Sequence, residues 1–220
     1  MLEACWRLER TGFEVSYIEP NSEGIIELEN IKAAIRDDTI LISAMHVNNE
    51  IGSIQDIAAI GTIAKECGIA FHTDAVQSFT KIPINVKEMN IDMMSVSAHK
   101  FHGPKGIGFM YLRKGIQLEP LIVGGGQERG MRSGTINAPL IAGMAQAVKI
   151  ELSSRKETEQ KIIKLREILM QRLFDSLDGI KINGSIESRI ADNLNLYISG
   201  IKTDCLLYTS MLSSLVFISL

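Results

Sequence analysis

Three short apolar runs constrain the fold of this chain more than any other feature of its sequence. They cover residues 39–45, 69–73 and 91–96, and each has the length of a buried β-strand. Helical spacing of apolar residues marks stretches 28–35 and 56–67 beside them. This order favours a parallel sheet with right-handed crossovers. We therefore expect an α/β fold with a mostly parallel sheet and flanking helices, whose first run is buried on both faces.

A polar cluster directly follows each of the three apolar runs. The carboxyl ends of parallel strands lie at the same edge of a sheet, where α/β proteins build their sites. Three clusters at successive strand ends therefore predict one shared site. The residues that they bring to this edge are Asn49, Asp74, Gln77, Ser97, His99 and Lys100.

The chemistry of this set fits pyridoxal phosphate better than a nucleotide. A lysine amine at a rigid strand end can form a Schiff base with a carbonyl group. A nearby carboxylate can hold a protonated ring nitrogen, amides can bond a ring oxygen, and a serine beside a histidine can hold a phosphate. A dinucleotide site needs a G-x-G-x-x-G turn after a strand, whereas Gly106 and Gly108 lead into a strand.

Simpler interpretations of these residues stay open. Lys100 can be an ordinary surface lysine in a loop, and Asp74 can be the N-cap of a following helix. We interpret His72 as a hydrogen-bonded core histidine and His46 as structural. Cys5 and Cys67 fall on apolar helix faces, which is typical of packing cysteines.

Composition excludes several classes of protein. The chain has 220 residues, 45% of them hydrophobic, and a net charge of −3, which argues against a nucleic-acid or anionic-membrane partner. No stretch reaches the ~20 consecutive apolar residues of a membrane span. The first ten residues are too charged for a secretory signal, and three scattered cysteines predict neither a disulfide framework nor a zinc site. We expect a cytoplasmic protein without a metal.

The remaining stretches predict further elements around this framework. Turn signals, caps and apolar spacing indicate helices over 2–10 and from Asn137 onward, and strands over 13–18, 108–112, 179–182 and 193–198.

Four motifs, in order, resemble those of cysteine desulfurases of the NifS/IscS type: HVNNEIG, HTDAVQS, SAHKFHGPKGIG and GGGQERGMRSGT. These enzymes are pyridoxal-phosphate proteins of the class-V aminotransferase group. The resemblance runs from about Gly12 to Ile201. It implies a fold-type I, aspartate aminotransferase-like large domain over 1–138, and a linking helix with the start of the small C-terminal domain over 139–204.

The resemblance implies three catalytic residues. Lys100 would form the Schiff base with pyridoxal phosphate, and Asp74 would pair with the pyridinium nitrogen. His99 would bind the phosphate beside Lys100.

Four further residues would contact the cofactor in the same resemblance. Asn49 and Gln77 would lie on the side of the ring's O3′ atom, and Ser97 would bind the phosphate with His99. Thr135 would reach the phosphate of the partner subunit's cofactor, which implies a homodimer.

The implied activity converts L-cysteine to L-alanine and passes persulfide sulfur to an iron–sulfur scaffold or another acceptor protein. Alternatives are another class-V enzyme, such as an aminotransferase or a selenocysteine lyase, or a non-catalytic dimerising fragment. Residues 205–220 lose all turn and cap signals, so we expect a truncated or non-native tail. The family's N-terminal segment and cysteine loop are not found, and Cys205 sits in an apolar setting. We therefore expect this chain to be inactive by itself.

Overall fold

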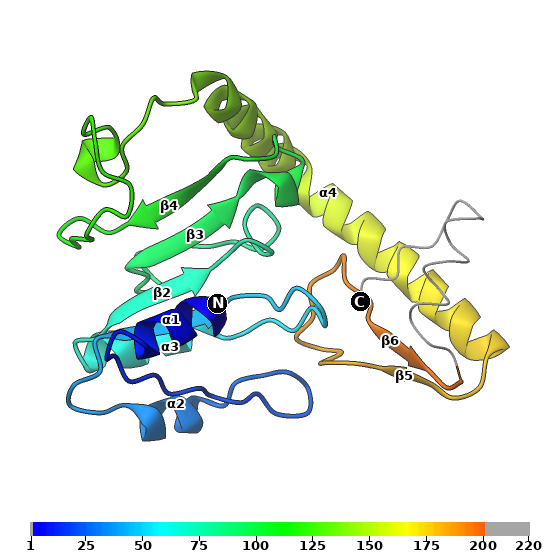
Figure 1. Ribbon diagram of the computed structural model, residues 1–220. Helices are drawn as coiled ribbons and strands as arrows, with labels where there is room; N and C mark the ends of the chain where they lie inside the picture. Colours follow the sequence, from blue (N-terminus) through cyan, green and yellow to red (C-terminus); the bar gives the residue numbers. More distant parts are fainter. Residues whose placement is uncertain (1, 201–220) are drawn as a thin grey trace.

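A computed structural model describes residues 2–200 of the chain, and its main elements are labelled in Figure 1. In chain order the elements are α1 (Leu2–Glu9), α2 (Leu28–Ala34), β1 (Leu41–Met45), α3 (Ile57–Glu66), β2 (Ala70–Asp74), β3 (Met93–Ser97), the 3₁₀-helix η1 (Ala98–Phe101), β4 (Gly108–Leu112), the 3₁₀-helix η2 (Glu128–Gly130), α4 (Ala138–Ser176), β5 (Ile180–Ile182) and β6 (Leu196–Ile198).

The larger sheet has the strand order β1-β2-β3-β4. β1, β2 and β3 are parallel, and β4 runs antiparallel to β3. Figure 1 shows the arrows of β2 and β3 pointing one way and that of β4 the other. The register pairs Met45 with Asp74 and Asp74 with Ser95. The predicted α/β class with a mostly parallel sheet and flanking helices is therefore confirmed.

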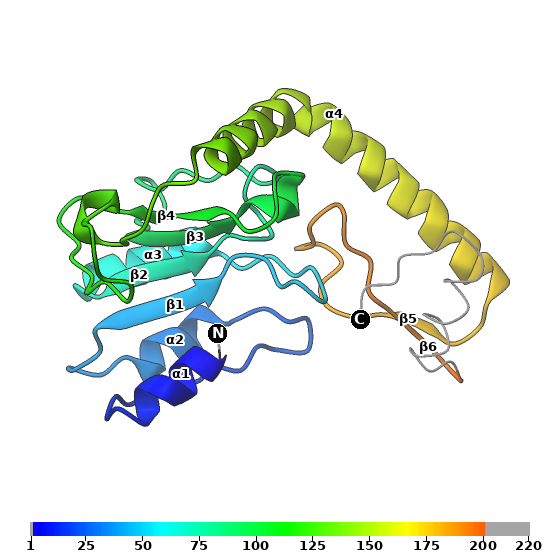
Figure 2. The same cartoon turned by 45° about the horizontal axis from the view of Figure 1, so that its top comes forward.

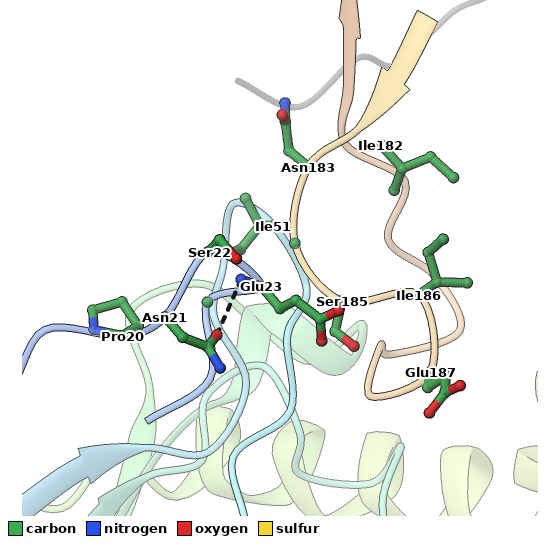
Figure 3. A pocket seen from close by; sticks show the side chains of 12 residues that line it. Pro20, Asn21, Ser22, Glu23, Ile51, Ile182, Asn183, Ser185, Ile186 and Glu187 are labelled. Carbon is green, nitrogen blue, oxygen red and sulfur yellow. Dashed lines mark hydrogen bonds between the residues drawn. The ribbon is translucent and has the colours of Figure 1, made fainter. Parts of the chain in front are cut away.

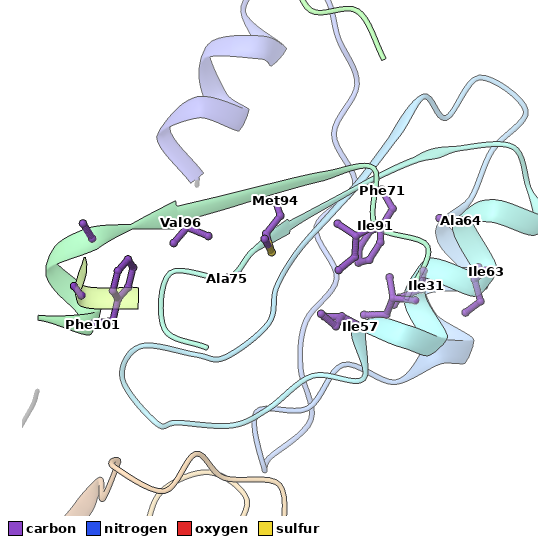
Figure 4. Packing of buried hydrophobic residues seen from close by; sticks show 13 residues of the cluster. Ile31, Ile57, Ile63, Ala64, Phe71, Ala75, Ile91, Met94, Val96 and Phe101 are labelled. Atoms are coloured by element: carbon purple, nitrogen blue, oxygen red, sulfur yellow. The ribbon is translucent and has the colours of Figure 1, made fainter. Parts of the chain in front are cut away.

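The hydrophobic core lies on one face of this sheet, where α3 packs against β2 (Figure 4). Phe71 of β2 is fully buried, together with Ile57 and Ile60 of α3. Asp56 begins α3 as its N-cap, because its side chain accepts a hydrogen bond from the backbone N–H of Ala59 at 2.9 Å. The sequence predicted a helix over 56–67 and the strand that follows it.

A single long helix, α4, joins the larger sheet to the two-stranded sheet formed by β5 and β6 (Figure 2). Asn137 caps its start by accepting from the N–H of Leu140 at 3.2 Å, and Pro139 lies in its first turn. The expected domain division at residue 138 stays a prediction. Within residues 2–200, no helix combines the length and apolar character that crossing a membrane requires.

Two sequence predictions about strands were wrong. Residues 13–18 form no strand, since a strand needs a ladder partner and this stretch pairs with no strand among the described residues. The run 39–45 is not buried on both faces. β1 is the edge strand of the sheet, so Ile40 and Leu41 are 68% and 45% exposed.

The packing interpretation of Cys67 was also wrong. Cys67 is exposed at the C-cap of α3, beyond the last helical residue, whereas Cys5 is half-buried.

Gly61 provides a test of the packing between α3 and its neighbours. A Cβ atom at this position would collide with the backbone carbonyl oxygen of Met89. Helix propensity alone favours Gly61→Ala by about 0.5–1 kcal/mol. Because backbone cannot yield as a side-chain tip can, we expect a net destabilisation of about 1–3 kcal/mol in urea unfolding.

Thr62→Ala is the matched control, because Thr62 is exposed on the same helix. It should change the unfolding free energy by less than about 0.5 kcal/mol. A Gly61→Ala protein as stable as the parent would contradict the packing described.

Candidate active site

The parallel pairing of β1, β2 and β3 brings the predicted site to one edge of the larger sheet. β2 ends at Asp74 and β3 at Ser97, while β1 ends at Met45, beside Asp74. The chain leaves all three strands on the same side, toward the small sheet (Figure 2). The predicted convergence of the three polar clusters thus has its structural basis in the register of the strands.

Asp74 is half-buried as the last residue of β2. Its Oδ1 atom accepts a hydrogen bond from the N–H of Val76 at 2.9 Å, and its backbone carbonyl accepts one from the N–H of His46 at 2.9 Å. Turns, and no helix, follow over residues 76–81, so Asp74 stabilises a turn and is not a helix N-cap. Among the described residues, its second carboxylate oxygen stays available to another donor.

Lys100 lies in η1, directly after β3. Ala98 and Phe101 of this helix are buried at 0% and 1% exposure, which anchors it, while His99 and Lys100 are exposed. The Oγ atom of Ser97 lies 2.9 Å from Nδ1 of His99. A hydroxyl and an imidazole are therefore held together within three residues of the lysine amine.

Asn49 is exposed in the turn after β1, where its Nδ2 donates to Oε1 of Glu50 at 2.5 Å. The side chain of Asn48 builds this turn, because its Oδ1 accepts from the N–H groups of Glu50 and Ile51 at 2.9 and 3.0 Å. Gly52 completes it with a φ of +71°, which a residue with a Cβ rarely adopts.

Two asparagines far along the chain, which sequence analysis did not identify, hydrogen-bond to the turn that contains Asn49. The Nδ2 atoms of Asn193 and Asn195 both donate to the carbonyl oxygen of Glu50, at 2.9 and 3.1 Å. No local motif marks them, because their partner is more than 140 residues away in the chain. They connect the segment before β6 to the edge of the larger sheet.

Gln77 lies at the carboxyl edge of the parallel strands, whereas Thr135 does not. Gln77 is half-buried in the turn that follows Asp74. Thr135 is exposed in the loop after β4, where the N–H groups of its two preceding residues bond to Ile122 and Gln127. β4 runs antiparallel to β3, so this loop leaves the sheet at the opposite edge. The described residues do not bring Thr135 to Lys100, and its role across a dimer stays a prediction.

His72 was interpreted as a hydrogen-bonded core histidine; its hydrogen bonds are confirmed, but its side chain is half-buried and lies outside the core. Its Nδ1 lies 2.8 Å from Oγ of Ser43 on β1, and its Nε2 lies 2.9 Å from Oγ of Ser95 on β3. Burial lowers the pKa of His72, and the negative charge of Asp74 acts in the opposite direction. The ring is therefore neutral near pH 7.

His46 is buried at 3% exposure between β1 and the turn of Asn49. Burial lowers the pKa of His46 to about 4. Its backbone bonds to Asp74 and Gln55, which supports the structural interpretation.

A separate cleft of about 720 Å³ lies between the turn at Asn21 and the loop that follows β5 (Figure 3). Pro20, Ile51 and Ile182 contribute apolar walls, and Glu23 lies on the larger-sheet side. None of the predicted site residues lines it. The candidate active site is thus an open edge of the sheet, distinct from this cleft.

Comparison with known proteins identifies the class. Residues 2–209 match the family model described as aminotransferase class-V. The match extends over most of the chain and includes every predicted site residue, so the chain belongs to the class-V aminotransferase family.

Within that family the chain is similar to cysteine desulfurases. It is 46% identical over 209 residues to "Cysteine desulfurase IscS" of Histophilus somni, which covers 94% of this chain and 52% of the relative. A solved "NifS-like protein" is 39% identical with a TM-score of 0.91, covering 96% of this chain and 57% of that one. "SspA in complex with cysteine" is also 39% identical, with a TM-score of 0.78 and coverages of 96% and 58%. The chain spans about half the length of the curated relatives it matches.

Cys205 and the predicted tail over 205–220 lie outside the described residues.

The buried His46 makes stability depend on pH. Its folded pKa of about 4 is below the value of 6.5 expected when unfolded, so the unfolded chain binds more protons between these two values. Stability is therefore lost as pH falls from about 6.5 toward 4. We expect this histidine to remove about 2 kcal/mol of unfolding free energy between pH 7 and pH 5.

Urea unfolding at both pH values measures this loss. His46→Phe should show a smaller loss than the parent. His102→Ala should match the parent within about 0.5 kcal/mol, because the His102 side chain is 86% exposed and its contact with Glu151 is a surface ion pair. Equal pH dependence in the parent and His46→Phe would contradict the assignment of a buried, neutral imidazole.

Proposed function

We propose that this chain carries the cofactor centre of a pyridoxal-phosphate-dependent cysteine desulfurase. The observation that carries the proposal is the position of Lys100, directly after β3 and beside the Ser97–His99 pair, at the edge where Asp74 ends β2. The similarity to curated cysteine desulfurases supports the same function. Because the chain spans about half of those relatives, the activity is proposed for the protein to which this centre belongs.

The donor set at the edge fits pyridoxal phosphate. Lys100 would hold the aldehyde carbon through its amine, and Asp74 has a carboxylate oxygen available for a protonated ring nitrogen. Ser97 and His99 together offer a hydroxyl and a ring nitrogen to the phosphate. Asn49 and Gln77 offer amide groups to the ring's O3′ side.

When bound, pyridoxal phosphate supplies an electron sink for the electron pair released at the α-carbon of an amino acid. The negative charge of Asp74 would keep the ring nitrogen protonated, which would strengthen that sink. Lys100 would hold the cofactor through its amine and, as a free amine, could move a proton at the α-carbon of the substrate. The buried anchors of η1 restrict where that amine can reach.

L-cysteine is the proposed substrate, with L-alanine and protein-bound persulfide sulfur as products. The solved structure of SspA contains cysteine, as its title states, and its similarity to this chain supports the substrate. We propose that the sulfur goes to an acceptor protein such as an iron–sulfur scaffold. We also propose a cytoplasmic homodimer, in which Thr135 serves the partner's cofactor.

Borohydride reduction tests the assignment of Lys100. We expect reduction of the chain with pyridoxal phosphate to fix the label on the peptide that contains Lys100, as read by mass spectrometry. Lys100→Ala should lose this label, and Lys105→Ala, altered in the turn after η1, should keep it. Labelling of Lys105 in the unaltered chain would contradict the proposal.

The sulfur step has a separate test, because it needs a thiolate near the cofactor. Within residues 2–200, Cys5 lies in α1 and Cys67 at the end of α3, before β2 begins, and neither is at the carboxyl edge of the strands. We therefore expect these 220 residues, saturated with pyridoxal phosphate and given L-cysteine and a reductant, to release alanine no faster than Lys100→Ala.

Lys100-dependent alanine and sulfide release would contradict that expectation, and Cys205→Ser would then identify the thiol. Lys100-dependent amino transfer to a keto acid, without sulfide, would instead favour an aminotransferase.

A further inference from the structure

The imidazole of His72 joins the three parallel strands that form the candidate active site. Its two ring nitrogens lie within hydrogen-bond distance of Ser43 on β1 and Ser95 on β3. Backbone pairing places Ser43 opposite His72 and Ser95 opposite Asp74. One side chain therefore contacts both neighbouring strands, in addition to the backbone ladder.

His72 and Asp74 share a face of β2, because side chains alternate along a strand. Thr73 between them points to the other face, where it is fully buried. Among residues 2–200, Asp74 is also the charged group that acts on the pKa of His72. The register neighbours of His72 on β1 and β3 are Ser43 and Met93, and Ser95 is its second hydrogen-bond partner; none of these side chains titrates.

We propose that His72 is a positioning residue for Asp74, acting as a neutral bridge between Ser43 and Ser95. The bridge fixes the register of β2 against both neighbours and so sets where the Asp74 carboxylate lies relative to Ser97 and Lys100. This inference rests on the proposed function, since it concerns the carboxylate that would face the cofactor's ring nitrogen.

The neutral state of His72 matters as much as its position. A protonated imidazole two residues from Asp74, on the same face, would be a competing cation for that carboxylate. Two serine hydroxyls can satisfy a neutral ring completely, since each can donate or accept and the ring has one donor and one acceptor. The structure thus offers Asp74 a neighbour that holds the strand without neutralising the carboxylate.

A double-mutant cycle distinguishes positioning from a general structural role. His72→Phe removes both hydrogen bonds and should weaken pyridoxal-phosphate binding about tenfold, as measured by cofactor fluorescence titration. If His72 acts through Asp74, the same change in an Asp74→Asn background should weaken binding less than about twofold. His72→Gln, a neutral side chain that can donate and accept, should restore most of the affinity.

Thr73→Val is the matched control, because it changes the residue between His72 and Asp74 while keeping the shape of its side chain. The Thr73 hydroxyl has no hydrogen-bond partner among the described residues, and the variant should bind the cofactor as the parent does. Ser95→Ala removes only one end of the bridge and should cost about threefold in affinity with Asp74 present. It keeps the inference testable if His72→Phe fails to fold.

Equal losses in the parent and Asp74→Asn backgrounds, or no loss in any bridge variant, would overturn the inference. Nuclear magnetic resonance titration of His72 in the cofactor-free chain tests it even if the proposed function fails. Because the Asp74 charge raises the pKa of His72, Asp74→Asn should lower that pKa further. An unchanged His72 pKa in Asp74→Asn would show that the two side chains are not coupled and would overturn the inference.

Discussion

The parallel pairing of β1, β2 and β3 is the constraint on which the candidate active site depends. Parallel strands end at the same edge of a sheet, so the pairing itself places the turns after Met45, Asp74 and Ser97 near one another. β4 reverses direction and carries the chain to the opposite edge. That reversal separates the loop of Thr135 from the lysine.

Burial on one face of the sheet fixes this edge in place. Phe71 and Val96 pack into the core on one face, while His72, Asp74 and Ser95 lie on the other, which is half-buried. Because side chains alternate along the five residues of β2, its core residues and its candidate site residues lie on opposite faces of the same strand. A shift of one residue in register would exchange the two sets. This explains why a side-chain bridge between strands has consequences at the site.

Local signals in the sequence predicted what local physics determines. Asp56 is a cap because its carboxylate accepts from an N–H three residues on, and Asn137 caps the long helix that begins at Ala138 in the same way. The strand predicted over 13–18 fails because apolar alternation does not supply a ladder partner. Leu41 is exposed because β1 lies at the edge of the sheet. The order of the strands decides this, and the spacing of apolar residues in the sequence carries no information about that order.

The candidate site was predictable from the sequence only where its residues follow an apolar run. Asp74, Ser97 and Lys100 follow apolar runs, so the sequence marks them. Asn193 and Asn195 act on Glu50 across more than 140 residues, and the bonds of His72 to Ser43 and Ser95 join three separate strands. Such contacts arise only from the folded arrangement, and no pattern near these residues indicates their partners.

A crystal structure of this chain grown with pyridoxal phosphate tests the central claim most directly. We expect electron density continuous with Nζ of Lys100, with the ring nitrogen toward Asp74 and the phosphate at Ser97 and His99. Density joined to Lys105, or cofactor seated in the cleft between Asn21 and Asn183, would contradict the proposed centre.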